Sequence, residues 1–248
     1  MRFTLSLLVL LFTLTSPAVA MASPPDLSGT WAMKMVTTSN YRLAVVAQFT
    51  SVSTSIIQVN ITQDGHDLTL HTQFCSIDMS NTAPGIQPHL SSGFLESMTP
   101  NQRPGRLRRK QNSWRLHIPK MWDIHGMRMD DPDNDPMPED ADDPRVFDQD
   151  GNGHPGFTLH LEGRLGGDMH LAQRIWDQFD GELLSDDEIR GQVRWDSDQS
   201  VLDATSRRLR SNPTNEPNLD ESSFQMVRVY DGLSCADLMS QADRLFLE

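Results

Sequence analysis

Two runs of alternating apolar residues, separated by an Asp-Gly pair, restrict the fold of this chain more than any other feature. Apolar side chains occupy every second position of residues 57–61, before Asp64-Gly65, and the alternation returns in residues 68–74. A period of two places alternate side chains on one face of a strand. Asp-Gly tolerates the positive φ angles of a tight turn. The pattern predicts a β-hairpin whose buried face includes Leu68 and Leu70.

Similar alternation recurs along the chain, whereas a helical period occurs once, in residues 236–246. A second hairpin is expected at Gln111-Asn112-Ser113, and prolines and asparagines predict a loop over residues 206–223. The other expected strands begin at Gly29 or lie in residues 106–110, 114–118, 157–161, 189–195 and 224–229. These elements favour an all-β fold, an antiparallel β-barrel or sandwich with a short C-terminal helix and a long acidic loop.

The first 22 residues are typical of a secretory signal peptide. Arg2 precedes a nearly unbroken apolar run, residues 5–14, and the small residues Ala18, Ala20 and Ala22 follow it. That run is shorter than the roughly 20 residues of a membrane helix, and no later run approaches this length. We therefore expect a secreted or periplasmic protein without a transmembrane segment. Residues 23–248 are expected to form a single β-rich domain with an acidic insert at about 128–156.

The excess of acidic over basic residues limits the classes of partner that the protein is expected to bind. The chain has 21 Lys and Arg residues against 34 Asp and Glu residues, a net charge of −13. Nucleic-acid binding is not expected, because phosphate contacts need clustered cations. The basic cluster from Arg103 to Lys110 is expected to balance nearby acids, and a patch that binds an anionic ligand is the alternative. The partners that remain are an apolar small molecule or a protein surface, and we expect a monomer.

The two cysteines, Cys75 and Cys235, form an even pair in a chain expected to be exported, which favours a disulfide. The bond would close a loop of 160 residues. Two free buried thiols are the alternative.

A second motif, residues 148–156, places oxygen-bearing side chains at alternate positions among glycines. Ca²⁺ takes six to eight oxygen ligands, and glycine permits the sharp turn around it. The stretch resembles the calcium loops of EF-hands, dockerins and thrombospondin type 3 repeats. The resemblance implies side-chain ligands from Asp148, Asp150 and Asn152 and a carbonyl ligand from His154. It covers about ten residues, because Leu159 replaces the closing Glu and no flanking helices are expected.

Acidic residues upstream repeat the alternate spacing at Asp131, Asp133 and Asp135. They could complete the calcium site or form a second one. The alternative is a solvated, disordered acidic insert, which runs of like charge usually form. Prolines 132, 136, 138 and 144 exclude a helix or a central strand there. Calcium is the expected cofactor.

Gly29-Thr30-Trp31 resembles the opening Gly-x-Trp of lipocalins, in which the Trp closes one end of an eight-stranded barrel. The resemblance implies a small apolar ligand inside the barrel, lined by inward residues such as Leu68, Leu70, Leu159 and Leu161. An ordinary buried Trp on a first strand is the alternative. Aromatic residues are only 7% of the chain, and small barrels are usually packed, so we expect a filled interior.

Enzyme signatures such as Gly-x-Ser-x-Gly, His-Glu-x-x-His and a phosphate loop are missing from the sequence. Acidic pairs such as Asp177 and Asp180, or the run 186–188, could serve a hydrolase, but they are expected in solvated loops. We therefore expect no catalytic residues. The sequence favours an exported, calcium-stabilised binding or structural domain, with a lipocalin-like carrier as the alternative and a carboxylate-dependent hydrolase as the least favoured function.

Overall fold

The computed structural model describes residues 23–246, apart from residues 44, 45 and 165. The signal-peptide prediction falls on residues 1–22, which lie outside the described residues. The strands are β1 (Gly29–Leu43), β2 (Val46–Asp64), β3 (Asp67–Asn81), β4 (Ile86–Leu90), β5 (Asn101–Lys110), β6 (Ser113–His125), β7 (Phe157–Gly163), β8 (Gly167–Ser185), β9 (Glu188–Ala204) and β10 (Thr214–Arg228). The helices are α1 (Ser92–Ser97), the short 3₁₀ helix η1 (Arg207–Leu209) and α2 (Cys235–Leu245).

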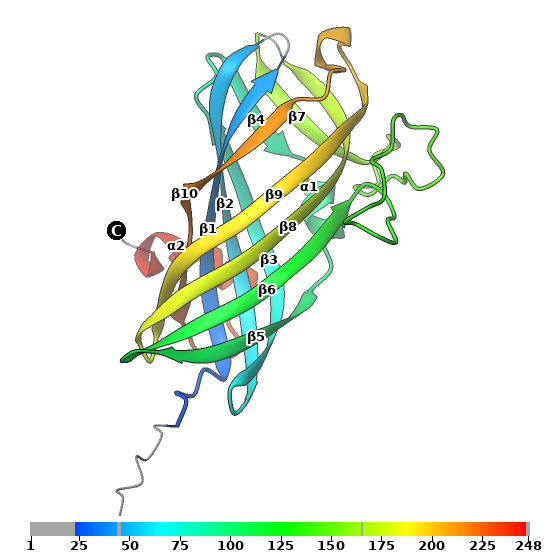
Figure 1. The fold of residues 1–248 in the computed structure, drawn as a ribbon. Coiled ribbons are helices and arrows are strands. Elements are labelled where there is room, and N and C mark those ends of the chain that lie inside the picture. Colours follow the sequence, from blue (N-terminus) through cyan, green and yellow to red (C-terminus); the bar gives the residue numbers. More distant parts are fainter. Residues whose placement is uncertain (1–22, 44–45, 165, 247–248) are drawn as a thin grey trace, which may run out of the picture.

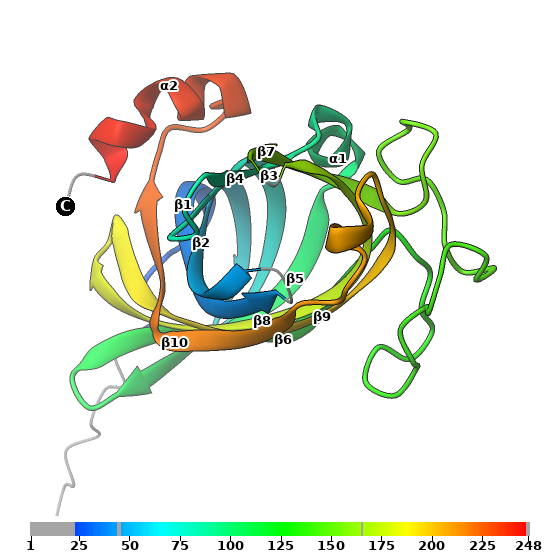
Figure 2. The same cartoon turned by 90° about the horizontal axis from the view of Figure 1, so that it is seen from above.

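All of the described strands belong to one antiparallel sheet that closes on itself. The order runs β4-β7-β8-β6-β5-β3-β2-β1-β10-β9, and an additional β8–β9 ladder closes the strands from β8 to β9 into a ring, here called the barrel, from which β7 and β4 branch at β8 (Figures 1 and 2). The predicted hairpins form, with Asp64 opposite Asp67 and Lys110 opposite Ser113. The expected all-β fold with a C-terminal helix is confirmed.

Different strands build the two ends of the barrel. The C-terminal part of β8 pairs with β6, whereas its first residues, Gly167–Leu171, pair with β7, which in turn pairs with β4. Among the described residues, no ladder joins β3 to β4, and β10 pairs with β9 only over Ser223–Val227. Side chains bridge these two seams, for example Asn215, whose Nδ2 donates to Ser197 Oγ over 2.8 Å. The barrel is therefore regular at one end and irregular at the other.

The regular end is filled. Trp31 is fully buried there, its Nε1–H donates to the Leu27 carbonyl over 2.9 Å, and the Arg228 guanidinium lies 4.5 Å from its ring centroid. The packed side chains around it include Val59, Leu68, Leu70, Leu107, Leu116, Ile118, Phe179, Ile189, Val193, Phe224 and Met226. Trp31 thus belongs to the packed core that closes this end.

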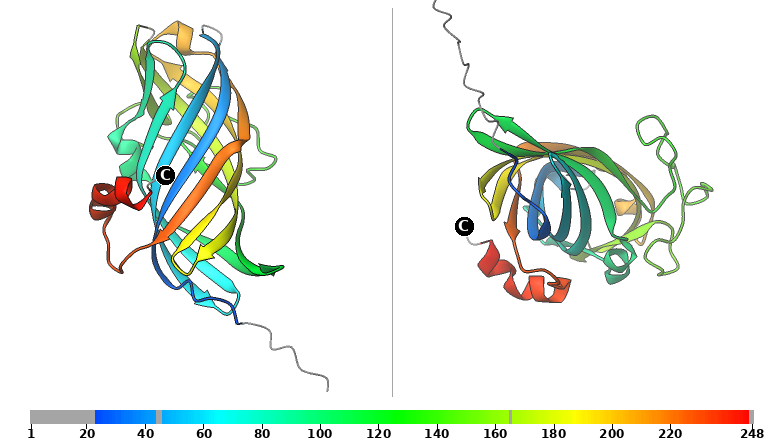
Figure 3. Two further views of the ribbon diagram at one scale, coloured as in Figure 1. Left: turned by 90° about the vertical axis from the view of Figure 1, so that its left-hand side faces the viewer. Right: turned by 90° about the horizontal axis from the view of Figure 1, so that it is seen from below.

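Helix α2 lies on the outside of the barrel (Figure 3). Ser234 and Asp237 form a capping box at its start. Leu238 is buried against the outer faces of Ala32 and Ile56. Cys235 is joined to Cys75 of β3 by a disulfide bond, which confirms the predicted pair. No helix among the described residues has both the length and the apolar character needed to cross a membrane.

The acidic insert has no helix or long strand, as its prolines predict, and it is attached to the barrel wall beside β6 and β8 (Figure 2). Arg174 Nη1 donates to the carbonyls of Pro132 and Asp135, both over 2.8 Å. Lys120 forms a 2.7 Å ion pair with Asp133 and lies 4.5 Å from the Trp122 ring. Lys120 therefore balances part of the insert's charge, and Arg174 holds its backbone against the barrel.

Two sequence predictions of loops are wrong. Residues 214–223 belong to β10 rather than to a loop, and Asp177 and Asp180 lie in the middle of β8. The inward faces of these long strands carry polar as well as apolar side chains, which interrupts the alternation that reveals a strand. Some of these polar side chains, such as those of Gln173 and Asp177, line a cavity at the irregular end of the barrel.

Candidate ligand-binding cavity

The irregular end of the barrel contains a cavity of about 220 Å³. The expectation of a filled interior thus holds for one end and is wrong for the other. Leu159 and Leu161 line the cavity, whereas Leu68 and Leu70 belong to the packed core. A barrel of this size can hold one small ligand.

One half of the wall is mostly apolar. It comes from β3, from α1 and the residue that follows it, and from β4, β7 and the start of β8, which are consecutive in the sheet. Its side chains are Phe74, Ile77, Met79, Ile86, Leu90, Phe94, Met98, Phe157, Leu159, Leu161, Met169 and Leu171. Apolar walls of this kind bury most of a ligand's surface.

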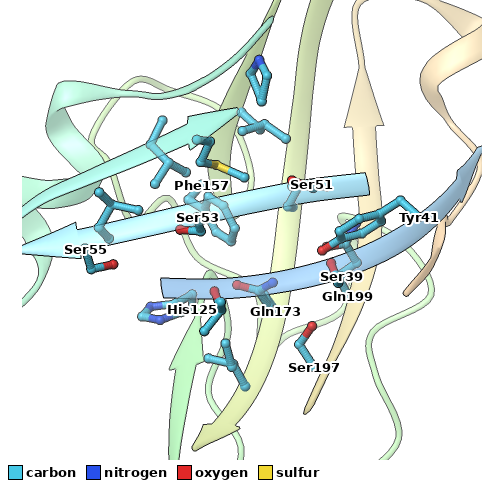
Figure 4. Close-up of a pocket in the computed structure, with 18 of the residues that line it drawn as sticks. Ser39, Tyr41, Ser51, Ser53, Ser55, His125, Phe157, Gln173, Ser197 and Gln199 are labelled. Carbon is cyan, nitrogen blue, oxygen red and sulfur yellow. The ribbon is translucent and has the colours of Figure 1, made fainter. Parts of the chain in front are cut away.

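The other half of the wall is rich in hydroxyl and amide groups. Ser39 of β1 and Ser51, Ser53 and Ser55 of β2 form a row of hydroxyls, and Gln173, Ser197 and Gln199 of β8 and β9 continue it (Figure 4). Ser39, Ser51, Ser55 and Ser197 are almost completely buried. Ser51 Oγ donates to the Ser80 carbonyl and Ser197 Oγ accepts from Asn215, and each hydroxyl has further hydrogen-bonding capacity, so this side suits a ligand with donors or acceptors.

Three charged residues lie where the cavity meets the packed core. Arg103 of β5 forms an ion pair with Asp177 of β8, and Asp123 of β6 accepts a 3.0 Å hydrogen bond from Asn101 Nδ2. Desolvation, and then the charge of Asp177, raises the pKa of Asp123 to about 6, although Arg103 opposes this shift. Desolvation also raises the pKa of Asp177, again opposed by Arg103.

His125 completes this region as a neutral side chain. Its ring packs at 5.1 Å from Phe94 and at 6.2 Å from Phe157, measured between centroids. Burial lowers its pKa to about 4, so the imidazole carries no charge at neutral pH. It can offer a ligand one donor and one acceptor.

Sequence reasoning missed this charged group, because Arg103 was grouped in a basic cluster expected to balance nearby acids and Asp177 was expected in a solvated loop. Arg103 alternates with Gly105 and Leu107 on the buried face of β5, while Arg106 and Arg108 face outward. The alternation of residue types with a period of two within residues 101–107 could have indicated that Arg103 faces the interior. Asp177 and Asp180 lie three residues apart on β8, which places them on opposite faces, so they do not form an acid–base pair.

The predicted calcium loop is held by its own side chains. The two carboxylate oxygens of Asp148 accept hydrogen bonds from the backbone of Asn152 and Gly153, at 3.1 and 2.8 Å. Asp150 Oδ2 accepts from Ser91 Oγ and from Thr158 N, at 2.6 and 2.9 Å. Asn152 Oδ1 accepts from the backbone N–H of His154. The loop is therefore fastened to α1 and β7.

The fit of this loop to a cation is partial. Asp150 Oδ1 is buried and has no hydrogen-bond partner, which leaves one oxygen free for an ion. In the part of the chain that the structure describes, no three His, Cys, Asp or Glu residues gather into a metal-binding group. Calcium binding stays a prediction.

The acidic residues upstream of that loop form hydrogen bonds and an ion pair of their own. Asp135 Oδ2 accepts from the backbone N–H groups of Asp130 and Asp131, and Asp133 is paired with Lys120. Asp131 accepts from Asn134 Nδ2 over 2.8 Å. These contacts give no added support to a second calcium ion.

Comparisons with known proteins add no further assignment. The chain matches no protein-family model, no curated protein and no solved structure. The function has to be inferred from the cavity itself.

Proposed function

We propose that this protein binds a small amphiphilic molecule inside its barrel. The observation that carries the proposal is the cavity of about 220 Å³, with an apolar half facing a half rich in hydroxyl and amide groups. Drug-sized pockets measure about 300–1,000 Å³, so the ligand is expected to be compact. A structural module would gain stability from a filled interior, since empty space forfeits packing contacts.

A carrier similar to the lipocalins is the version of this function that we favour. Trp31 closing one end, the interior cavity at the other and the disulfide to a C-terminal segment all support it. The contact of Arg228 with the face of Trp31 adds to the rigidity of the closed end. The hydrolase alternative has no support from the paired acids, because Asp180 faces away from Asp177.

A neutral fluorescent probe, N-phenyl-1-naphthylamine, tests the proposal. We expect saturable one-to-one binding with a rise in fluorescence, because the probe leaves water for an apolar wall. Ser53 lines the cavity, so the larger side chain of Ser53→Phe should fill part of it. We expect this variant to bind the probe about 10-fold more weakly or worse, which corresponds to a loss of about 1.4 kcal/mol or more of binding free energy.

The matched control is Thr54→Phe, on the opposite face of the same strand. It should bind the probe as the unmodified protein does. The proposal is rejected if the unmodified protein shows no saturable binding, or if both variants bind as it does.

A further inference from the structure

The charges at the inner end of the cavity do not balance. Arg103 is committed to Asp177: it forms the ion pair, its Nη2 donates to the Asp177 carbonyl over 3.2 Å, and its guanidinium lies 5.1 Å from the Phe179 centroid. The two side chains are 8% and 10% exposed. Asp123 has no cation of its own among the described residues and accepts a hydrogen bond from the neutral amide of Asn101.

The other groups around Asp123 do not supply the missing charge. The charged groups that act on it are Arg103 of β5, already paired, and Asp177 of β8, which repels it. His125, two residues along β6, is neutral at pH 7 because burial lowers its pKa to about 4. Ser197 and Gln199, the nearby lining residues of β9, carry no charge. An ionised Asp123 therefore leaves one excess negative charge at the cavity.

A buried carboxylate without a counter-charge is costly, and it is neutralised either by a proton or by a cation. The raised pKa of Asp123, about 6, reflects the first route in the ligand-free protein. At neutral pH the group is mostly ionised, so a bound cation would relieve the excess charge.

We propose that the ligand is an amphiphilic amine, whose ammonium group pairs with Asp123 while its apolar body lies against the wall of β3, β4 and β7. This inference rests on the proposed function and specifies its ligand class. Charge-assisted hydrogen bonds to a desolvated carboxylate are stronger than neutral ones.

Anionic and neutral ligands fit this site less well. Arg103, the cation whose charge acts on Asp123, is already engaged with Asp177, so a carboxylate ligand would face Asp123 without a partner. A neutral ligand would leave the charge of Asp123 uncompensated. The net charge of −13 also draws cations toward the protein.

Isothermal titration calorimetry with octylammonium, 1-octanol and octanoate tests the ligand class at constant chain length. At pH 7.5 we expect octylammonium to bind about 10-fold or more tightly than 1-octanol, since hydrogen bonds to charged groups contribute about 1.5–3 kcal/mol. Alkylammonium groups stay protonated near lysine's pKa of about 10.4. Because Asp123 titrates near pH 6, octylammonium binding should weaken about 10-fold at pH 5.

Asp123→Asn should abolish both the preference for the amine and its pH dependence, while 1-octanol binding is kept. Asp180→Asn, which removes a carboxylate from the outer face of β8, should change neither. Thermal unfolding establishes that both variants are folded, and the pH dependence of the unmodified protein tests the proposal independently of them.

The outcomes separate the inference from the proposed function. Equal affinity for octylammonium and 1-octanol, or tighter binding of octanoate, overturns the amine proposal and leaves the cavity as a binding site. Absence of binding by all three ligands, together with absence of probe binding, overturns both.

Discussion

At the scale of single residues, the most informative group is Asp123, because it connects the ligand class with the stability of the free protein. Its pKa in the folded protein, about 6, lies above the ordinary value of 3.8. The folded protein therefore binds this proton more tightly than the unfolded chain does. The associated stability is complete below pH 4 and is lost as the pH rises through 6.

We expect Asp123→Asn to stabilise the ligand-free protein at pH 7.5 and to change it little near pH 4. The shift corresponds to at most about 3 kcal/mol of unfolding free energy at the higher pH, because the neutral amide avoids the desolvation cost. Urea unfolding at the two pH values measures the difference. Equal effects of the substitution at both pH values would contradict the assigned titration.

The residue scale also shows where sequence reasoning worked and where it did not. Cys75 and Cys235 could be paired because they are the two cysteines of the chain, which leaves one possible intrachain bond. Both interpretations of Trp31 place it in the interior, where it is fully buried. Arg103 and Asp177 could not be paired, since their ion pair depends on strands β5 and β8 flanking β6 on either side in the sheet.

At the scale of elements, strands with one apolar face were predictable and strands lining the cavity were less so. The β2–β3 and β5–β6 hairpins follow from alternation and turn residues. The polar inward residues of β8 and β9, such as Gln173 and Gln199, break that alternation. The sequence pattern that weakened the strand prediction is therefore the one that makes the cavity amphiphilic.

The predicted calcium loop belongs to this scale, because it fastens α1 to β7 through Asp150. We expect Ca²⁺ to raise the melting temperature with a dissociation constant on the order of 10⁻⁴–10⁻³ M, weak because the closing Glu is replaced by Leu159. At a 100-fold excess, linkage gives about 2.7 kcal/mol. Differential scanning fluorimetry with calcium and with chelator measures the effect.

Asp150→Asn should remove most of that gain, because it neutralises the carboxylate that has an unpartnered oxygen. Asp142→Asn, an exposed acid elsewhere in the insert, is the control for the loss of one negative charge. A melting curve that calcium and chelator leave unchanged would exclude a stabilising site.

At the scale of the whole molecule, stability and binding are assigned to opposite ends of the barrel. The end closed by Trp31 is packed and has continuous ladders, including β9 with β10 over Ser223–Val227. The other end has two seams bridged by side chains and holds the cavity. A binding site is expected in the less tightly packed part of a fold, because ligand entry needs local opening.

The Cys75–Cys235 bond acts at this same scale, since its residues are 160 positions apart and it joins the C-terminal helix to β3. We expect Cys75→Ser/Cys235→Ser to lower the unfolding free energy by about 2–5 kcal/mol, because the bond restricts the unfolded chain. Probe binding should stay unchanged, because the ring is closed by the β1–β10, β9–β10 and β8–β9 ladders, and Leu238 still packs against Ala32. Chemical denaturation and N-phenyl-1-naphthylamine titration of the same variant separate the two effects. Loss of probe binding in a variant that keeps its native circular dichroism would show that the bond shapes the cavity as well as the unfolded state.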